Sequence, residues 1–146
     1  MDFITLDPED ANVSSFLDSL GKFPFSFVAI NHPGDYEKES IVFRANEDID
    51  SLYGFILFFY VEDMETGLPD YSQTHFLTFD EIEIEEGGHI EIFTRKGEDA
   101  TTIDQDTYVF RQIIYWGLPT PIWNIPHSSY ELMKRNDSIG GDLGND

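Results

Sequence analysis

The sequence predicts an α+β fold in which a mainly antiparallel sheet of about five strands carries two or three helices on one face. Apolar residues recur at helical spacing near the N-terminus and again after residue 100. The segments between them are rich in aromatic and β-branched residues, or alternate with period two, as strands do. Strands and helices do not alternate regularly, which argues against a parallel α/β sheet. We therefore expect a single globular domain over residues 1–135 and a disordered, acidic, Gly- and Asp-rich tail over residues 136–146.

The first predicted element is a helix over residues 8–20. Asp7 is a suitable N-cap, Pro8 suits the first helical position, and Gly21 is a typical stop. The apolar residues of this segment fall on one stripe, which predicts that the helix packs against the core.

Three strands are expected next. Residues 23–30 and 40–45 are aromatic and β-branched, and turn-forming residues separate them. The run 52–62 has no polar face, which favours a central strand covered on both sides. A buried helix is the alternative that this run leaves open. The polar loop 63–74 is long for a compact domain and is therefore a candidate for function.

Residues 79–94 predict a β-hairpin with one apolar and one carboxylate face, because isoleucine and glutamate alternate along both halves. A three-residue loop ending at Gly88 keeps the isoleucines on one face. The same register sets Glu83 opposite Glu91, and a like-charged pair costs stability. The carboxylates therefore either serve binding or guard an edge hairpin against strand addition.

The last predicted elements are helical. Thr102 and Gln105 have capping-box spacing, and an apolar stripe follows them until the segment 116–119 ends the helix. Three prolines make the next stretch extended, and residues 127–135 predict a final short helix.

Charge is the most unusual property of this chain. Its 29 acidic residues against 8 basic ones give a net charge of −21, whereas solubility alone needs a magnitude of about 2 to 8. Such a charge disfavours direct contact with nucleic acid or an anionic membrane surface. A basic partner, a bound cation or a high-salt habitat would each explain it, and so would an acidic proteome.

Cysteine usage and hydropathy bear on the compartment. The absence of cysteine excludes disulfides and suits a reducing environment. The N-terminus lacks the basic and apolar regions of a signal peptide, and the longest near-apolar run, 52–61, is too short for a membrane helix. We therefore expect a cytoplasmic protein.

Motifs for catalysis are missing from the sequence. There is no cysteine and no Gly-x-Ser-x-Gly elbow, and Ser128 beside His127 suits a helix cap better than a nucleophile. The four histidines are scattered, without metal-binding spacing, and no EF-hand pattern occurs. His89 would face Glu85 across the predicted hairpin, where the carboxylate would raise its pKa. We predict no enzyme activity, no cofactor and no metal.

The acidic surface therefore carries the main functional hypothesis. Carboxylates at i and i+2 of a strand are about 6.7 Å apart, whereas one strand of duplex DNA has a phosphate every ~3.4 Å. A single glutamate column thus needs further acids beside it to imitate a nucleic acid. The candidate partner-binding residues are Glu81, Glu83, Glu85, Glu91, Glu47, Asp48, Asp50, Glu62, Asp63 and Glu65.

With these residues the chain would be a small inhibitory protein of the immunity or anti-defence type. Its carboxylates would imitate the phosphates of a nucleic acid. Its acidic face would block the basic groove of a nuclease or another nucleic-acid-processing enzyme. Whether the chain is a monomer or a dimer does not follow from the sequence.

Two other classes remain open. An acidic chaperone or adaptor, expected to be dimeric, would bind a partner segment on an apolar patch formed by Ile122, Trp123 and Ile125. Capping the core is the favoured use of the same three side chains. The third class is a hydrolase or metal enzyme that uses carboxylates.

Overall fold

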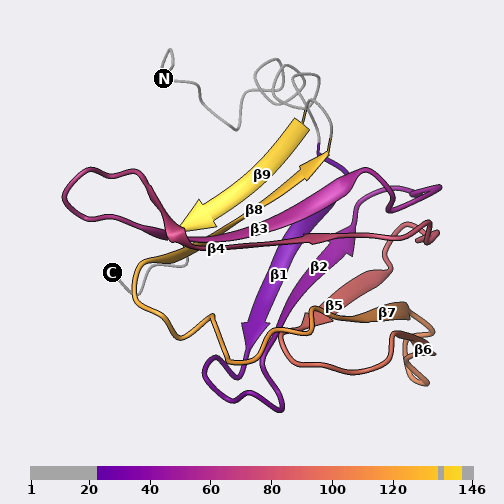
Figure 1. Ribbon diagram of the computed structural model, residues 1–146. Coiled ribbons are helices and arrows are strands. Elements are labelled where there is room, and N and C mark those ends of the chain that lie inside the picture. The colour runs from indigo at the N-terminus through magenta and orange to yellow at the C-terminus, as the bar shows by residue number, and fades with distance from the viewer. Residues whose placement is uncertain (1–22, 135–136, 143–146) are drawn as a thin grey trace, which may run out of the picture.

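The computed structural model describes residues 23–134 and 137–142, which form nine β-strands in two sheets (Figure 1). This part of the chain contains no helix, so the α+β prediction is wrong here and the described fold is all-β. The strands are β1 (Phe25–Asn31), β2 (Ser40–Ala45), β3 (Phe55–Glu62), β4 (Pro69–Thr78), β5 (His89–Phe93), β6 (Ala100–Ile103), β7 (Phe110–Tyr115), β8 (Ser128–Lys134) and β9 (Asp137–Asp142).

The two sheets differ in composition. The first has five strands in the order β1-β2-β5-β7-β6, and its β5–β7 pair is parallel. The second has four antiparallel strands in the order β4-β3-β8-β9. In Figure 1 the second sheet lies across β1 and β2 of the first, and the main hydrophobic cluster draws residues from both. The fold is therefore two sheets with a shared core between them.

Alternating side chains of the central strands fill this core. Leu57 and Phe59 on β3 are fully buried, as are Ile41 and Phe43 on β2. The neighbouring outward-facing residues of β3 are only half-buried. β3 pairs with β4 on one side and β8 on the other, so the run 52–62 does supply a central strand. The expected cover on both faces is wrong, because the outward-facing residues are only half-buried.

The two predictions of a helix after residue 100 are wrong, because the described residues form strands there. The segment with capping-box spacing forms β6, a turn and β7, and the segment 127–135 contains β8. In β8, Tyr130 and Leu132 belong to the core, while Glu131 and Met133 are only half-buried. These short apolar patterns fit the period of a helix as well as that of a strand, and pairing with neighbouring strands decides which one forms.

The predicted 79–94 hairpin is also wrong. β5 pairs with β2 and with β7, and the segment before it makes a single bridge, between Ile84 and Ile49. Glu83 and Glu91 are therefore not cross-strand partners. Ile84 and Ile90 still reach the core, so the apolar alternation was a sound guide to burial but not to pairing.

Two further predictions concern the ends of the chain. The predicted helix over residues 8–20 lies outside the described residues. The segment expected to be a disordered tail contains β9, which pairs with β8. No helix capable of spanning a membrane occurs in residues 23–134 and 137–142.

Candidate functional site

Two acidic segments, far apart in the sequence, lie side by side at one end of the molecule. The backbone groups of Ile49 and Ile84 exchange hydrogen bonds of 2.7 and 2.9 Å, and Leu52 N donates to Ile82 O at 2.8 Å. The Asp48 carboxylate also accepts a hydrogen bond from Glu86 N, at 2.9 Å. These contacts fix residues 46–52 against residues 81–88.

This pairing concentrates exposed carboxylates. Because the Ile49–Ile84 bridge is antiparallel and both isoleucines are buried, their chain neighbours lie opposite one another and point outward. Asp48 is thus beside Glu85, and Asp50 is beside Glu83. We call this surface the acidic edge, and its exposed members are Glu47, Asp48, Asp50, Asp80, Glu81, Glu83, Glu85 and Glu86.

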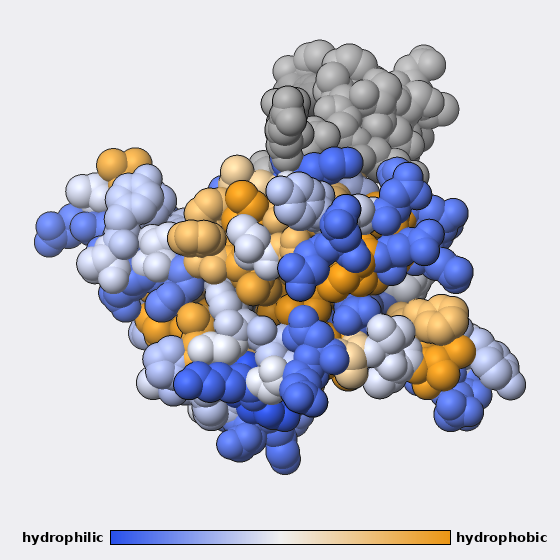
Figure 2. All heavy atoms as spheres, turned by 45° about the vertical axis from the view of Figure 1, so that its right-hand side comes forward, coloured by the Kyte–Doolittle hydropathy of each residue, from blue (hydrophilic) through white to orange (hydrophobic). Residues whose placement is uncertain are grey.

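Aromatic side chains flank the acidic edge. A groove of about 190 Å³ is lined by Glu83 and Glu85 together with Phe110 of β7. Tyr108, in the turn before β7, is 72% exposed and lines a neighbouring hollow with Glu85. Figure 2 brings this end forward and shows hydrophilic residues gathered above a smaller hydrophobic patch. Exposed aromatic residues are enriched at protein interfaces.

Glu91 does not belong to this surface. It is only 8% exposed and lies on the outer face of the five-stranded sheet. Its carboxylate pairs with Arg111 Nη1 at 2.7 Å and accepts a hydrogen bond from Ser40 Oγ at 2.6 Å. Glu91 is therefore engaged within the fold.

The other predicted acids are also separated from the acidic edge. Glu62 ends β3, and Asp63 and Glu65 lie in the loop that joins β3 to β4. The acidic edge lies near the first residue of β3, and Glu62 is its last residue. The eight residues of this strand span roughly 26 Å. Figure 1 shows the β3–β4 loop on the far side of the molecule.

The proposed apolar patch is mostly core. Ile122 and Trp123 are each 2% exposed, and the Trp123 ring packs edge-on against Phe59 with centroids 5.3 Å apart. Ile125 is partly buried against the same cluster. Of the two uses open to these side chains, the structure shows core packing for Ile122 and Trp123.

The structure also has an apolar surface that the sequence did not predict. On the outer face of the four-stranded sheet, Phe58 and Tyr60 of β3 and Tyr71 of β4 line a hollow of about 320 Å³. Phe76 contacts Phe58 there, and it is 64% exposed. The signal was present in the alternation of Ile56, Phe58 and Tyr60 with core residues, but the run looked apolar on both faces.

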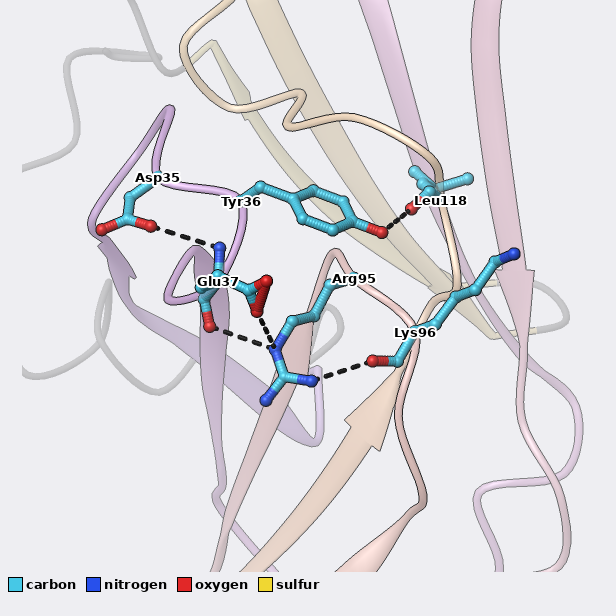
Figure 3. A network of polar contacts seen from close by, with 6 residues as sticks. All are labelled: Asp35, Tyr36, Glu37, Arg95, Lys96 and Leu118. Atoms are coloured by element: carbon cyan, nitrogen blue, oxygen red, sulfur yellow. Dashed lines mark hydrogen bonds and ion pairs between the residues drawn. The ribbon is translucent and has the colours of Figure 1, made fainter.

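A buried carboxylate anchors the loops at the other end of the first sheet. Glu39 is completely buried and accepts hydrogen bonds from Gly34 N, Ile122 N, Trp123 N and Thr94 Oγ1. Nearby, Tyr36 donates to Leu118 O at 2.7 Å, and Arg95 donates to Glu37 O and Lys96 O (Figure 3). These contacts serve the architecture.

His89 also differs from expectation. It lies on the outer sheet face beside Arg44 and Arg111, so it does not pair with Glu85. Burial lowers its pKa below 6.5, and the two arginines lower it further, while Glu91 acts in the opposite direction. The predicted upward shift is therefore wrong. Within the described ranges, no group of three or more histidine and acidic residues is arranged to hold a metal.

Comparison with known proteins does not assign this chain to a family. No family model matches the sequence, and no curated protein matches it closely enough to indicate a relative.

Proposed function

We propose that this chain is a small acidic binding protein that inhibits a nucleic-acid-processing partner by occupying its basic groove. The acidic edge is the docking surface, and the protein acts in the cytoplasm without catalysis of its own. The observation that supports this proposal is the pairing of residues 46–52 with residues 81–88, which brings both acidic segments together.

The spacing of the carboxylates suits a groove that binds phosphates. Around the Ile49–Ile84 bridge, two extended rows with carboxylates at every second residue would average one carboxylate per ~3.4 Å of length, similar to one strand of duplex DNA. Asp48 beside Glu85 and Asp50 beside Glu83 also place like charges together at a cost to stability. A cationic partner would remove that cost on binding.

The physical mechanism is electrostatic and steric. A net charge of −21 steers a basic partner towards the chain, with association that slows as salt is added. Tyr108 and Phe110 supply apolar contact area next to the carboxylates, and such residues commonly carry much of the binding energy. The bound chain excludes nucleic acid from the groove.

The test compares two variants with the same change in net charge. Glu83→Lys/Glu85→Lys reverses two members of the acidic edge, and Glu62→Lys/Glu65→Lys reverses two glutamates at the opposite end. The full chain is used as bait in a lysate of its source cells. We expect wild type and the second variant to retain a basic nucleic-acid enzyme, and the first variant to lose it. Duplex DNA or RNA should release the enzyme, and wild-type chain should inhibit it.

Equal loss in both variants would show that net charge alone drives capture. Retention by both variants would exclude the acidic edge as the docking surface. Thermal unfolding of each variant ensures that loss of capture does not reflect loss of fold.

A second function, of another class, is suggested by the exposed aromatic face of the four-stranded sheet. An acidic adaptor would hold an apolar partner segment against Phe58, Tyr71 and Phe76. Tyr71→Ala/Phe76→Ala would then abolish capture, while Glu83→Lys/Glu85→Lys would retain it. The inhibitor proposal expects the opposite pair of results.

A further inference from the structure

A row of cationic side chains crosses the outer face of the five-stranded sheet. The register sets Arg44 of β2 opposite His89 of β5, and His89 beside Arg111 of β7. Arg44 and His89 alternate with core residues, and Arg111 precedes the buried Gln112, so all three point away from the core. Neighbouring strands are ~4.8 Å apart, so one guanidinium flanks the imidazole on each side. Basic residues in adjacent positions cost stability, in a chain that has few of them.

The donors of this row are largely unclaimed. Arg95 differs, because it is held by backbone carbonyls and lies over the rings of Phe93 and Tyr115. Arg111 gives one nitrogen to Glu91 and keeps its remaining donors. Arg44 is exposed, and no carboxylate of the described residues lies within ion-pair distance of it.

Two arginines flank His89 in the row, in a chain whose net charge is −21. Burial is the largest cause of the lowered pKa of His89, Arg111 and Arg44 lower it further, and Glu91 opposes them. An overall charge of −21 would by itself favour the protonated imidazole. The two arginines therefore act on His89 more strongly than Glu91 does.

A concave surface of about 570 Å³ adjoins the row. His89 and Arg111 lie on its border, and the apolar side chains of Ile103, Val109 and Ile113 line it. Two carboxylates also line it, but both are occupied. Glu91 is paired with Arg111 and Ser40, and Asp104 accepts hydrogen bonds from the backbone of Asp106 and Thr107.

We propose that this surface binds a phosphate monoester, with the phosphate over His89 between Arg44 and Arg111 and the organic group in the adjoining hollow. The three terminal oxygens of a phosphate monoester can accept from both guanidinium groups and from the imidazole at once, whereas a carboxylate has only two oxygens. Thr102, the cross-strand neighbour of Arg111, adds a hydroxyl at the border of the hollow. His89 also lines the groove bordered by Glu83 and Glu85, so this site adjoins the acidic edge, but it needs no protein partner.

The test follows the imidazole resonances of His89 by NMR, assigned with His89→Gln, at constant ionic strength. The probes are inorganic phosphate, phenyl phosphate and benzoate. We expect saturable shifts with phosphate and a rise in the pKa of His89, because a bound anion favours its charged form. Phenyl phosphate should bind more tightly than phosphate, and benzoate more weakly than phenyl phosphate. Arg44→Gln should weaken binding about tenfold, as expected for one charge-assisted hydrogen bond.

Lys96→Gln is the matched control, because it removes the same charge from an exposed lysine outside the row. Equal weakening by Arg44→Gln and Lys96→Gln would overturn the proposal, as would linear, unsaturable shifts. Benzoate binding as tightly as phenyl phosphate would exclude the phosphate class. A short phosphotyrosine peptide separates the sources: tighter binding than phenyl phosphate assigns the ester to a protein, and weaker binding assigns it to a small molecule.

Discussion

Glu39 shows how a single residue can fix the relative positions of several loops. Its carboxylate is completely buried and has no cationic partner among the described residues. Three backbone N–H groups and one hydroxyl satisfy it instead, and they come from the β1–β2 loop, the end of β5 and the segment before β8. A buried charge is tolerated only when its acceptor sites are filled in this way. Glu39 therefore joins three parts of the chain.

Replacement of Glu39 by glutamine should destabilise the fold by about 3 kcal/mol, because the amide nitrogen would face N–H donors and leave buried groups unpaired. Equilibrium unfolding in urea measures this change. Glu37→Gln is the matched control, since Glu37 is exposed and should change stability by no more than about 0.5 kcal/mol. Similar small effects from both variants would show that the Glu39 contacts do not hold the loops.

At the scale of elements, the sequence predicted strands better than helices. The predicted strand 40–45 has the same bounds as β2, and the run 52–62 contains β3. Both are short, bounded by turn residues and dominated by aromatic and β-branched side chains. The helix errors lie in β7 and β8, where four or five apolar residues satisfied a helical stripe as well as an alternating one. The predicted loop 63–74 also overlaps β4. Only the neighbouring strands decide such cases, and these come from distant parts of the chain.

Gly97 offers a test of the packing at the end of β7. A Cβ at this position would lie 2.5 Å from the Tyr115 ring, which stacks on Phe93 and is covered by Arg95. Because Phe93 and Arg95 both pack against the ring and restrict its movement, Gly97→Ala should cost about 1–3 kcal/mol in the free energy of unfolding. Urea denaturation of the variant measures this cost.

The same substitution in a Tyr115→Ala background is the control. Removing the ring removes the clash, so Gly97→Ala should then cost much less, and the difference is the coupling energy of the pair. An unchanged cost in that background would mean that the ring is not its cause.

For the whole molecule, the sequence predicted the acidic character and most members of the acidic edge, but not their arrangement. Residues 46–50 and 81–85 were both candidates, yet nothing in their spacing indicated that Ile49 would pair with Ile84. Glu91 shared the alternating pattern and is nevertheless engaged with Arg111, because β5 pairs with β2 and β7. Local periodicity predicts which face a residue takes, and tertiary pairing decides which residues share a surface.

The density of like charges at the acidic edge should itself be measurable as a loss of stability. Glu83→Gln/Glu85→Gln removes the charges beside Asp50 and Asp48 and should raise the free energy of unfolding by about 0.2–1 kcal/mol per pair at low salt. Glu62→Gln/Glu65→Gln changes the net charge equally at the other end of β3 and should have a smaller effect. Added salt screens repulsion, so the difference between the two variants should shrink from low to high ionic strength. If both variants stabilise equally, the repulsion is spread over the whole surface and the acidic edge is not a site of concentrated charge.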